Sequence, residues 1–396
     1  MTKNHHEIII SGAGMIGLTF ALLMAEKKIK VCIIDKNDKK LLFAQQDNRT
    51  TAISQGSHRI YRKLGIWEKL KNEFQPINQI CVSEGLGFHD LNFDYKNLKE
   101  GPLGFIVDNK LIKKTLLNEV SKSKYISFKY DSEIIDINNE DIDNSFIETK
   151  NFNLYFKMLV AADGRFSRTR FHANIKYYYH DYQQTAFVFN ISHSKKHHGV
   201  ALERFFPTGP LAILPVHNSK INQSSIVWTI DNKVANDEVF KENFKEEFKK
   251  KYDNFFGKLI CLSEVKKYPL NVFSCYDIFK KNIVLIGDAC QAIHPIAGQG
   301  FNLGLRDAFI LAETLSKSKE LGLEPFNLNL MNSYENKRKI DKTLLVNATH
   351  NLNGLFSGSG KFKSLLRKTG LRIFSQSNFL KNQSMLFAMG LRNLEA

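Results

Sequence analysis

The first forty residues of the chain alternate between apolar runs and glycine-rich or charged breaks. Glu7–Ile10 is a short run of β-branched residues, which is typical of a buried strand. Leu18–Lys27 has apolar side chains at helical spacing, and Val31–Ile34 is a second β-branched run. The pattern predicts a strand, a helix and a second, parallel strand within about 30 residues.

Later apolar runs predict further strands and helices. Phe105–Val107 and Met158–Ala161 favour additional parallel strands, and Asn282–Ile286 favours another buried strand. In the middle of the chain the period changes to two and polar turns separate the runs, as in an antiparallel sheet. The charged segment Asp237–Tyr252 and the segment Gly304–Leu315 are predicted helices. The four runs of period two are Thr185–Ser192, Val200–Phe206, Leu211–His217 and Ser224–Ile230.

These elements predict an α/β fold in which a Rossmann-like domain is interrupted by an inserted antiparallel-sheet domain. A chain of 396 residues is longer than a single hydrophobic core usually accommodates, so two interlocked domains are expected. The stretch Ile8–Ala25 is apolar enough to resemble a membrane span. Because glycines interrupt it, we interpret it as a buried strand and a buried helix, and we expect a soluble or peripheral protein.

Gly12, Gly14 and Gly17 stand in GxGxxG spacing between the first predicted strand and the helix, and Asp35 ends the second strand. Glycines there permit a tight turn and let backbone N–H groups approach a pyrophosphate at the helix N-terminus. An acid about 20 residues further on can accept hydrogen bonds from a ribose diol. The glycines alone are a weak signal, but the strand, helix and acid around them predict dinucleotide binding.

Charge and cysteine content change this picture in two ways. The chain carries 56 Lys and Arg against 40 Asp and Glu, a net charge of +16, and part of that excess reflects general use of lysine. Five cysteines without a CxxC pair argue against a disulfide framework and against a zinc site, and they suit a reducing compartment. His197 and His198 are adjacent and cannot easily share one ion with His193, so no metal is expected.

The last 54 residues, from Thr343 onward, hold seven basic residues against one acid, Glu395. Phe362, Leu365 and Leu366 recur at helical spacing among the basic residues, and a further apolar set follows up to Leu391. A basic amphipathic helix of this kind suits an anionic bilayer surface. The alternative is that the tail forms a pair of helices packed on the nucleotide-binding domain. Both interpretations can be true if one face of the helices packs on the domain and another face contacts the membrane. No nucleic-acid recognition motif accompanies the charge.

Four motifs together resemble the single-component flavoprotein aromatic hydroxylases, and more narrowly the ubiquinone-biosynthesis hydroxylase family. The first is the GxGxxG unit, and the second runs from Asp47 through Arg49 to Ser54 and on to Trp67. The other two are Leu159–Arg170, with Asp163-Gly164 at its centre, and Gly287–Gly304. The resemblance spans nearly the whole chain in the right order.

The resemblance implies FAD as cofactor, NADH or NADPH as reductant and O2 as co-substrate. In that class a flavin C4a-hydroperoxide transfers the hydroxyl group, so no side-chain acid or base is assigned. The glycine turn would bind the pyrophosphate, Asp35 the ribose, and Asp288 the ribityl hydroxyls. Arg49, Asp163 and Gly164 would lie near the pyrophosphate or the nicotinamide path. The flavin-ring environment would comprise Pro295, Gly298, Gln299, Gly300, Phe301 and Asn302.

The same resemblance implies a Rossmann-like FAD-binding domain, an antiparallel-sheet substrate domain and a C-terminal helical segment. We expect the FAD-binding domain in three parts, residues 1–75, 103–175 and 281–335. The substrate domain would take residues 76–102 and 176–280, and basic amphipathic helices residues 336–396.

The chain departs from the family pattern at one functional position. Cys290-Gln291 stands where the family usually has Ala-His, so a hydrogen-bonding role survives but a titratable one is lost. Asp35 replaces the more usual Glu, and Lys28 stands where a Gly is common. Cys290 is expected to be a small packing residue, and His294 a structural loop residue.

The expected function is hydroxylation of a polyprenylated phenol or benzoquinol in ubiquinone biosynthesis. The expected location is the cytoplasm, peripheral on the inner face of the membrane, with other ubiquinone-biosynthesis proteins as possible partners. One alternative is a hydroxylase of a small soluble aromatic, which would leave the basic tail without a purpose. Another alternative is a non-catalytic FAD-binding scaffold of a membrane-associated complex. The replacement of the family's usual His by Gln291 is the reason to consider this alternative.

Overall fold

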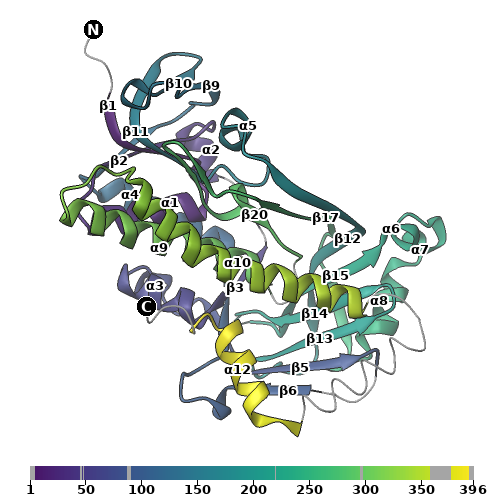
Figure 1. Ribbon diagram of the computed structural model, residues 1–396. Helices are drawn as coiled ribbons and strands as arrows, with labels where there is room; N and C mark the ends of the chain where they lie inside the picture. The colour runs from purple at the N-terminus through teal and green to yellow at the C-terminus, as the bar shows by residue number, and fades with distance from the viewer. Residues whose placement is uncertain are drawn as a thin grey trace.

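The computed structural model describes residues 5–44, 47, 49–86, 91–218, 220–294, 298–356 and 376–391. Figure 1 shows two sheet-containing halves joined by long strands, with helices α9 (Gln299–Glu320) and α10 (Leu328–Phe356) lying across them. The N-terminal strand is in one half, and the C-terminal helix α12 (Asn378–Ala388) lies beside the other. Among these described residues, no helix combines the length and apolar character needed to cross a bilayer.

The first half is a Rossmann-like sheet with the strand order β18-β19-β11-β1-β2-β8. Five of its strands run parallel, and the apolar runs predict four of them, all except β8. Helix α1 (Met15–Glu26) packs on them in contact with both α4 (Asn109–Lys122) and α9. Short strands β9 (Ile134–Asn138) and β10 (Phe146–Thr149) extend the sheet through β11. The main strands are β1 (His5–Ser11), β2 (Val31–Ile34), β8 (Ile126–Lys129), β11 (Asn153–Ala161), β18 (Phe279–Lys280) and β19 (Ile283–Leu285).

One predicted parallel strand is wrong. The run at Phe105 is strand β7 (Gly104–Asp108), which lies in a separate sheet between β3 (Thr50–Ser54) and β4 (Phe74–Ile77) and pairs antiparallel with both. Its apolar side chains are buried, and a fully buried run has the same composition in either orientation. The apolar run alone therefore could not show whether this strand pairs parallel or antiparallel with its neighbours.

The second half is a nine-stranded sheet with the order β20-β17-β12-β15-β14-β13-β5-β6, and β16 joins it through β12. The four runs of period two are its central strands, and the predicted limits of β13 (Val200–Phe206) match the structure. Most neighbours pair antiparallel, whereas β13 pairs with β5 in parallel. The other strands are β5 (Gln79–Glu84), β6 (Leu91–Asp94), β12 (Tyr177–His193), β14 (Gly209–Pro215), β15 (Gln223–Asp231), β16 (Leu259–Leu262), β17 (Lys266–Cys275) and β20 (Gln291–Ala292).

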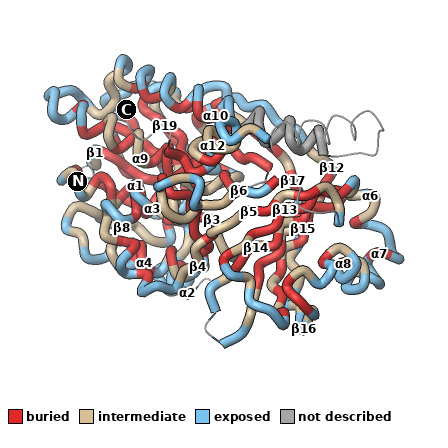
Figure 2. Tube along the Cα trace, turned by 90° about the horizontal axis from the view of Figure 1, so that it is seen from below, coloured by how far each residue is buried: buried red, intermediate tan, exposed pale blue. Residues whose placement is uncertain are grey.

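Helices cover the two faces of this second sheet. The predicted helix Asp237–Tyr252 is divided into α7 (Glu238–Glu242) and α8 (Phe244–Tyr252) at the Asn243 junction, and α6 (Asn232–Ala235) precedes them. Figure 2 shows α7 and α8 on one side of strands β13 to β15, with α10 and α12 on the other. On the α8 side, Trp228 packs within about 6 Å of the Phe240 and Phe248 rings.

The remaining elements are short, apart from the two long helices at the end of the chain. Residues 361–373 of the predicted basic tail lie outside the described residues. The later part of that tail forms helix α12. The predicted helix at Gly304–Leu315 is longer than expected, because α9 already begins at Gln299. The short elements are α2 (Lys39–Ala44), α3 (Gln55–Lys63), α5 (Arg168–His172) and the 3-10 turns η1 (Trp67–Leu70), η2 (Tyr95–Asn97), η3 (Ile142–Asn144) and η4 (Gly287–Ala289).

Candidate functional site

Three of the four sequence motifs meet at one edge of the Rossmann-like sheet. Ser11, Ala161 and Leu285 end neighbouring parallel strands and lie in register with one another. The segments that follow them are the glycine turn, the Asp163-Gly164 turn and the Gly287-Asp288 turn, so all three leave the sheet at the same place. The carboxyl edge of a parallel sheet is where ligands bind in open α/β folds.

The glycines of the first turn have different surroundings, and the difference points to a ligand. A Cβ atom at Gly12 would collide with the carbonyl of Ala162, and one at Gly17 would collide with the carbonyl of Gly12. At Gly14 a Cβ would lie 4.0 Å from the Ala162 carbonyl oxygen, with no closer neighbour. Gly12 and Gly17 are therefore required by the fold, whereas Gly14 leaves space in front of the helix.

The N-terminus of α1 faces this space without a cap. Gly14 is the N-cap residue, and the first turn contains no acid. Within the described part of the chain, no side chain caps this turn. The first N–H groups of a helix carry a partial positive charge and need acceptors. A phosphate group placed over Gly14 would satisfy them.

Asp35, at the end of β2, lies against the glycine turn. Its Oδ2 accepts a hydrogen bond from the backbone N–H of Ala13 at 2.7 Å. Its Oδ1 accepts from the backbone and the side-chain amide of Asn37, both at 2.9 Å. The carboxylate thus ties the end of β2 to the turn, in the position from which a ribose diol could be bound.

Asp163 combines a structural contact with an unsatisfied atom. Its Oδ2 accepts hydrogen bonds from the backbone N–H and the hydroxyl of Thr169, at 3.1 and 2.9 Å. Its Oδ1 is buried and has no hydrogen-bond partner among the described residues. Gly164 follows with a φ of +83°, and a Cβ there would meet no atom within 4 Å. This second turn is therefore open on the same side as the first.

Asp288 is the exposed residue of the third turn. The protein around it nevertheless raises the pKa of the carboxyl above its ordinary value, an effect that Arg165 and Arg49 oppose. The preceding residue, Gly287, packs against Ile16 of α1, and Gly304 of α9 packs on Gly287. These close contacts hold the three motifs together.

Arg49 approaches the same region from strand β3. Its guanidinium makes two hydrogen bonds to Asp47, at 2.8 and 2.7 Å, and lies 5.5 Å from the ring centre of Tyr268 on β17. The hydrogen bonds to Asp47 raise the pKa of Arg49. Asn109 also donates to Asp47, at 3.1 Å. A fixed cation is thus held between the Rossmann-like half and the second sheet.

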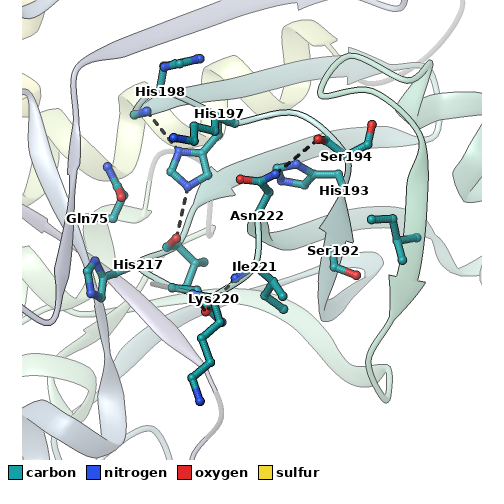
Figure 3. Close-up of a pocket in the computed structure, with 15 residues that line it drawn as sticks. Gln75, Ser192, His193, Ser194, His197, His198, His217, Lys220, Ile221 and Asn222 are labelled. Atoms are coloured by element: carbon teal, nitrogen blue, oxygen red, sulfur yellow. Dashed lines mark hydrogen bonds between the residues drawn. The ribbon is translucent and has the colours of Figure 1, made fainter.

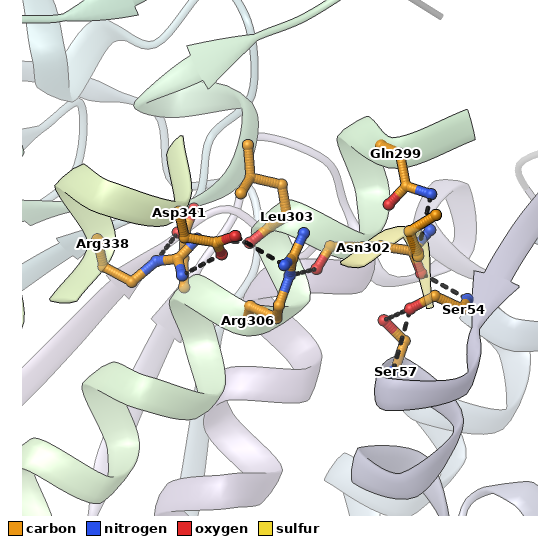
Figure 4. A network of polar contacts seen from close by, with 10 residues as sticks. Ser54, Ser57, Gln299, Asn302, Leu303, Arg306, Arg338 and Asp341 are labelled. Carbon is orange, nitrogen blue, oxygen red and sulfur yellow. Dashed lines mark hydrogen bonds and ion pairs between the residues drawn. The ribbon is translucent and has the colours of Figure 1, made fainter. Parts of the chain in front are cut away.

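The predicted flavin-ring segment begins α9. Pro295 lies outside the described residues, and Gly298 is the N-cap with a φ of +60°. None of the side chains that the structure describes caps this helix end. Asn302 does not point outward, because it accepts from the Ser54 N–H and donates to the Ala52 carbonyl, both at 2.8 Å. Gln299 donates to the carbonyl of Ala388 in α12 at 3.1 Å. Figure 4 shows Gln299, Asn302 and Ser54 grouped at this end of the helix.

Behind this helix end lies a buried ion network that the sequence did not indicate. Oδ2 of Asp307 accepts from the Gly287 N–H at 3.0 Å and from the Gln291 amide at 2.7 Å. Oδ1 of Asp307 pairs with Arg338 at 2.6 Å. Asp341 then joins Arg338, at 2.6 Å, to Arg306, at 2.8 Å, as Figure 4 shows for the latter three. The network connects the third turn to α9 and α10.

Two further residues of the fourth motif are not free to act as acid or base. Burial lowers the pKa of His294 to about 4, and its Nε2 lies 3.3 Å from Oε1 of Gln184. Cys290 is buried, and desolvation raises the pKa of its thiol well above the ordinary value. His294 is therefore neutral at physiological pH, and both residues serve packing and positioning.

A separate pocket of about 800 Å³ lies at the other end of the second sheet and contains none of the predicted site residues. Figure 3 shows His193, His197, His198 and His217 around it. His197 lies 3.2 Å from the Val216 carbonyl, and its Nδ1 accepts from the Gly199 N–H at 3.1 Å. Within the described part of the chain, no group of histidine, cysteine and acidic residues could hold a metal ion.

Comparisons with known proteins agree with this geometry. Residues 5–347 match the family described as "FAD binding domain". The chain is 32% identical over 392 residues to "Ubiquinone hydroxylase UbiL" of Rhodospirillum rubrum, covering 98% of this chain and 90% of the relative. It is 26% identical to "3-demethoxyubiquinol 3-hydroxylase" of Escherichia coli, covering 99% of this chain and 100% of the relative. The structure of p-nitrophenol 4-monooxygenase PnpA from Pseudomonas putida superposes with a TM-score of 0.83 at 15% identity, covering 99% of this chain and 100% of that chain, and shows the same fold.

Proposed function

The chain belongs to the FAD-binding-domain family and, within it, to the ubiquinone hydroxylases, and we propose that it hydroxylates the ring of a polyprenylated phenol or benzoquinol in ubiquinone biosynthesis. The observation that carries the proposal is the meeting of three turns at the carboxyl ends of β1, β11 and β19. Together they offer an uncapped helix N-terminus, an orphaned carboxylate oxygen and an accessible acid in one place.

The residues present fit FAD at this edge. The open position at Gly14 accommodates the pyrophosphate over the first N–H groups of α1, and Asp35 is placed for the adenosine ribose. Asp288 would accept hydrogen bonds from the ribityl hydroxyls, because it is exposed and follows Gly287, which packs between Ile16 of α1 and Gly304 of α9. The N–H groups at the start of α9, from Gly298 to Asn302, would favour negative charge on a flavin ring bound there.

FAD, once bound, supplies the redox chemistry, accepting electrons from NADH or NADPH and activating O2. The residues of the protein would bind FAD, orient the substrate and exclude water from the site. The buried network around Asp307 fixes the Gly287 turn, and Asn302 fixes the first turn of α9 against β3. Arg49, held by Asp47 and facing Tyr268, places a positive charge on the path of an anionic nicotinamide cofactor. No side-chain acid or base is needed for these roles.

Membrane contact through the C-terminal segment is the second part of the proposal. Phe379 and Leu380, at the start of α12, are 70% and 42% exposed, and the residues before them are rich in lysine and arginine. Exposed apolar residues beside basic ones favour an anionic bilayer, where a polyprenylated substrate is dissolved. The proposed location is accordingly peripheral, on the inner face of the membrane, where other ubiquinone-biosynthesis proteins would be potential partners.

Flavin analysis and metabolite profiling test the proposed function together. The purified protein is expected to bind one FAD per chain and to oxidise NADH or NADPH faster when a short-chain prenylphenol is added. A strain that lacks the gene is expected to accumulate one under-hydroxylated prenylphenol, which identifies the blocked step. Unchanged quinone intermediates in the deletion strain, or a protein without flavin, would contradict the proposal.

A further inference from the structure

The interior face of the second sheet carries an accessible band of side chains that crosses five strands. Val188, Val227, Ala212, Glu203 and Val82 lie side by side on β12, β15, β14, β13 and β5. All five are partly accessible. The neighbouring residues that point to the α8 side, which include Phe187, Trp228, Leu211, Leu202 and Cys81, are buried.

The band faces the flavin-ring segment rather than the outside. Ala201, on the same face of β13 as Glu203, packs in one apolar cluster with Met385 of α12 and with Met389, the residue that follows this helix. The carbonyl of Ala388 in the same helix accepts the hydrogen bond from Gln299 at the start of α9. At the other edge of the face, Gln184 lies against His294. The band therefore lies between α12 and the segment that begins α9.

Glu203 is the acidic residue of this band. Val82 and Ala212 lie opposite it on the two neighbouring strands, and both are apolar. Burial alone raises the pKa of its carboxyl to about 7. The side chain is partly accessible, so the carboxyl group is not sealed into the core, and the protein around it is what removes its water.

Other titratable groups on this face lie away from Glu203. Glu84 lies opposite Phe205, one row from Glu203. Lys266 pairs with Val188 at the far end of the band, and Tyr268, one row from Lys266, pairs with Ala186 and has Arg49 over its ring. Arg204 points to the opposite face, where it donates to the carbonyl of Lys251 at 3.0 Å. Glu203 is thus an acid in apolar surroundings, with both strand neighbours opposite it apolar.

We propose that Glu203 is the base that accepts the proton of the substrate's phenol hydroxyl while the ring lies on the apolar band. This inference rests on the proposed function and adds a residue to it. The substrate O–H bond breaks, its electron pair stays on the substrate oxygen, and the proton moves to Glu203. NADH or NADPH supplies two electrons and O2 the inserted atom. The second oxygen atom leaves as water and takes up the proton that Glu203 held.

Two chemical arguments support this role. A phenolate ring is richer in electrons than a phenol ring, so oxygen transfer to it is easier. A base is most effective when its pKa is close to the operating pH, and an ordinary glutamate, with a pKa near 4.3, would hold the proton too weakly. The apolar neighbours Val82, Ala212 and Val227 suit an aromatic ring with an isoprenoid chain.

The test compares two phenols in the full-length, FAD-loaded protein. One is a short-chain prenylphenol, and the other is its ring-fluorinated form, whose hydroxyl is already ionised at the assay pH. Glu203→Gln is expected to lower the hydroxylation rate of the ordinary phenol by about a hundredfold or more. It is expected to change the rate of the fluorinated phenol by less than about tenfold, because no base is then needed. Glu203→Asp should recover part of the lost rate.

Controls separate the failure of this inference from the failure of the proposed function. Glu84→Gln removes a carboxylate from the same face one row away, and is expected to affect both phenols alike. An equal loss with both phenols in Glu203→Gln, or no loss with either, would overturn the assignment of Glu203. A wild-type protein that hydroxylates neither phenol would instead contradict the proposed function, and the role of Glu203 with it.

Discussion

The side-chain amide of Gln291 donates a hydrogen bond to Oδ2 of Asp307, with the two atoms 2.7 Å apart, and both residues are buried. The same oxygen accepts the backbone N–H of Gly287, the residue before Asp288. Gln291 therefore acts on the site through Asp307, which holds the third turn in place. The family usually has His at this position, and its ring N–H can donate to the same oxygen.

Replacing Gln291 by His is expected to leave flavin content and hydroxylation intact or to raise them, because the donor to Asp307 is kept. Gln291→Leu has a similar size without the donor, and it is expected to cost about 1–3 kcal/mol of stability. Urea unfolding, flavin absorbance and product analysis measure these effects. If Gln291→His abolished hydroxylation, the glutamine would have a role other than donation to Asp307.

Gly14→Val is expected to abolish FAD binding while the apoprotein remains folded. The structure leaves open space at this Cβ position, so the new side chain meets the ligand rather than the protein. Gly17→Val is the contrasting variant, because its Cβ would collide with the backbone of Gly12 and should unfold the domain. Circular dichroism separates the two, and normal flavin content in Gly14→Val would remove the pyrophosphate from this turn.

The sequence predicted the βαβ unit around Gly12 and Asp35, because glycine spacing and β-branched runs are local signals. It also predicted the strand Val200–Phe206, but could not show which face of that strand looks inward. Glu203 was missed for this reason, since its importance depends on strands β5 and β14 beside it. The network of Asp307, Arg338 and Asp341 was missed because charged residues on predicted helices are ordinarily interpreted as surface residues.

Removing one member of that buried network is expected to cost far more than removing a surface partner. Asp341→Ala leaves Arg306 and Arg338 buried without their shared acceptor, which costs about 3–5 kcal/mol. The control Glu324→Gln breaks the exposed pair with Lys157 and should cost less than about 1 kcal/mol. Urea unfolding at fixed FAD concentration measures both. Equal losses would show that the network does not stabilise the joint between α9 and α10.

Neutralising Lys363, Arg367 and Arg372 with Gln is expected to weaken binding to anionic vesicles by on the order of a hundredfold at low salt. Each basic residue near an anionic surface contributes about 1 kcal/mol, and salt screens the attraction. Replacing three exposed lysines of α8, Lys245, Lys249 and Lys250, removes the same charge and should leave vesicle binding unchanged. Turnover of a water-soluble phenol should be unaffected in both triple variants.

Undiminished vesicle binding in the tail variant, or none in the wild-type protein, would assign the tail to packing within the protein. The same loss in both triple variants would point to net charge rather than to this segment. Vesicle flotation at two salt concentrations distinguishes these outcomes.

The most direct test of the account is the fate of isotopically labelled O2 in a reaction with purified, FAD-loaded protein, NADH or NADPH and a short-chain prenylphenol. We expect mass spectrometry to find one labelled oxygen atom on the aromatic ring of the product, and none when the Gly14→Val variant is used. NAD(P)H consumption that yields peroxide and no labelled ring product, with every prenylphenol offered, would contradict it.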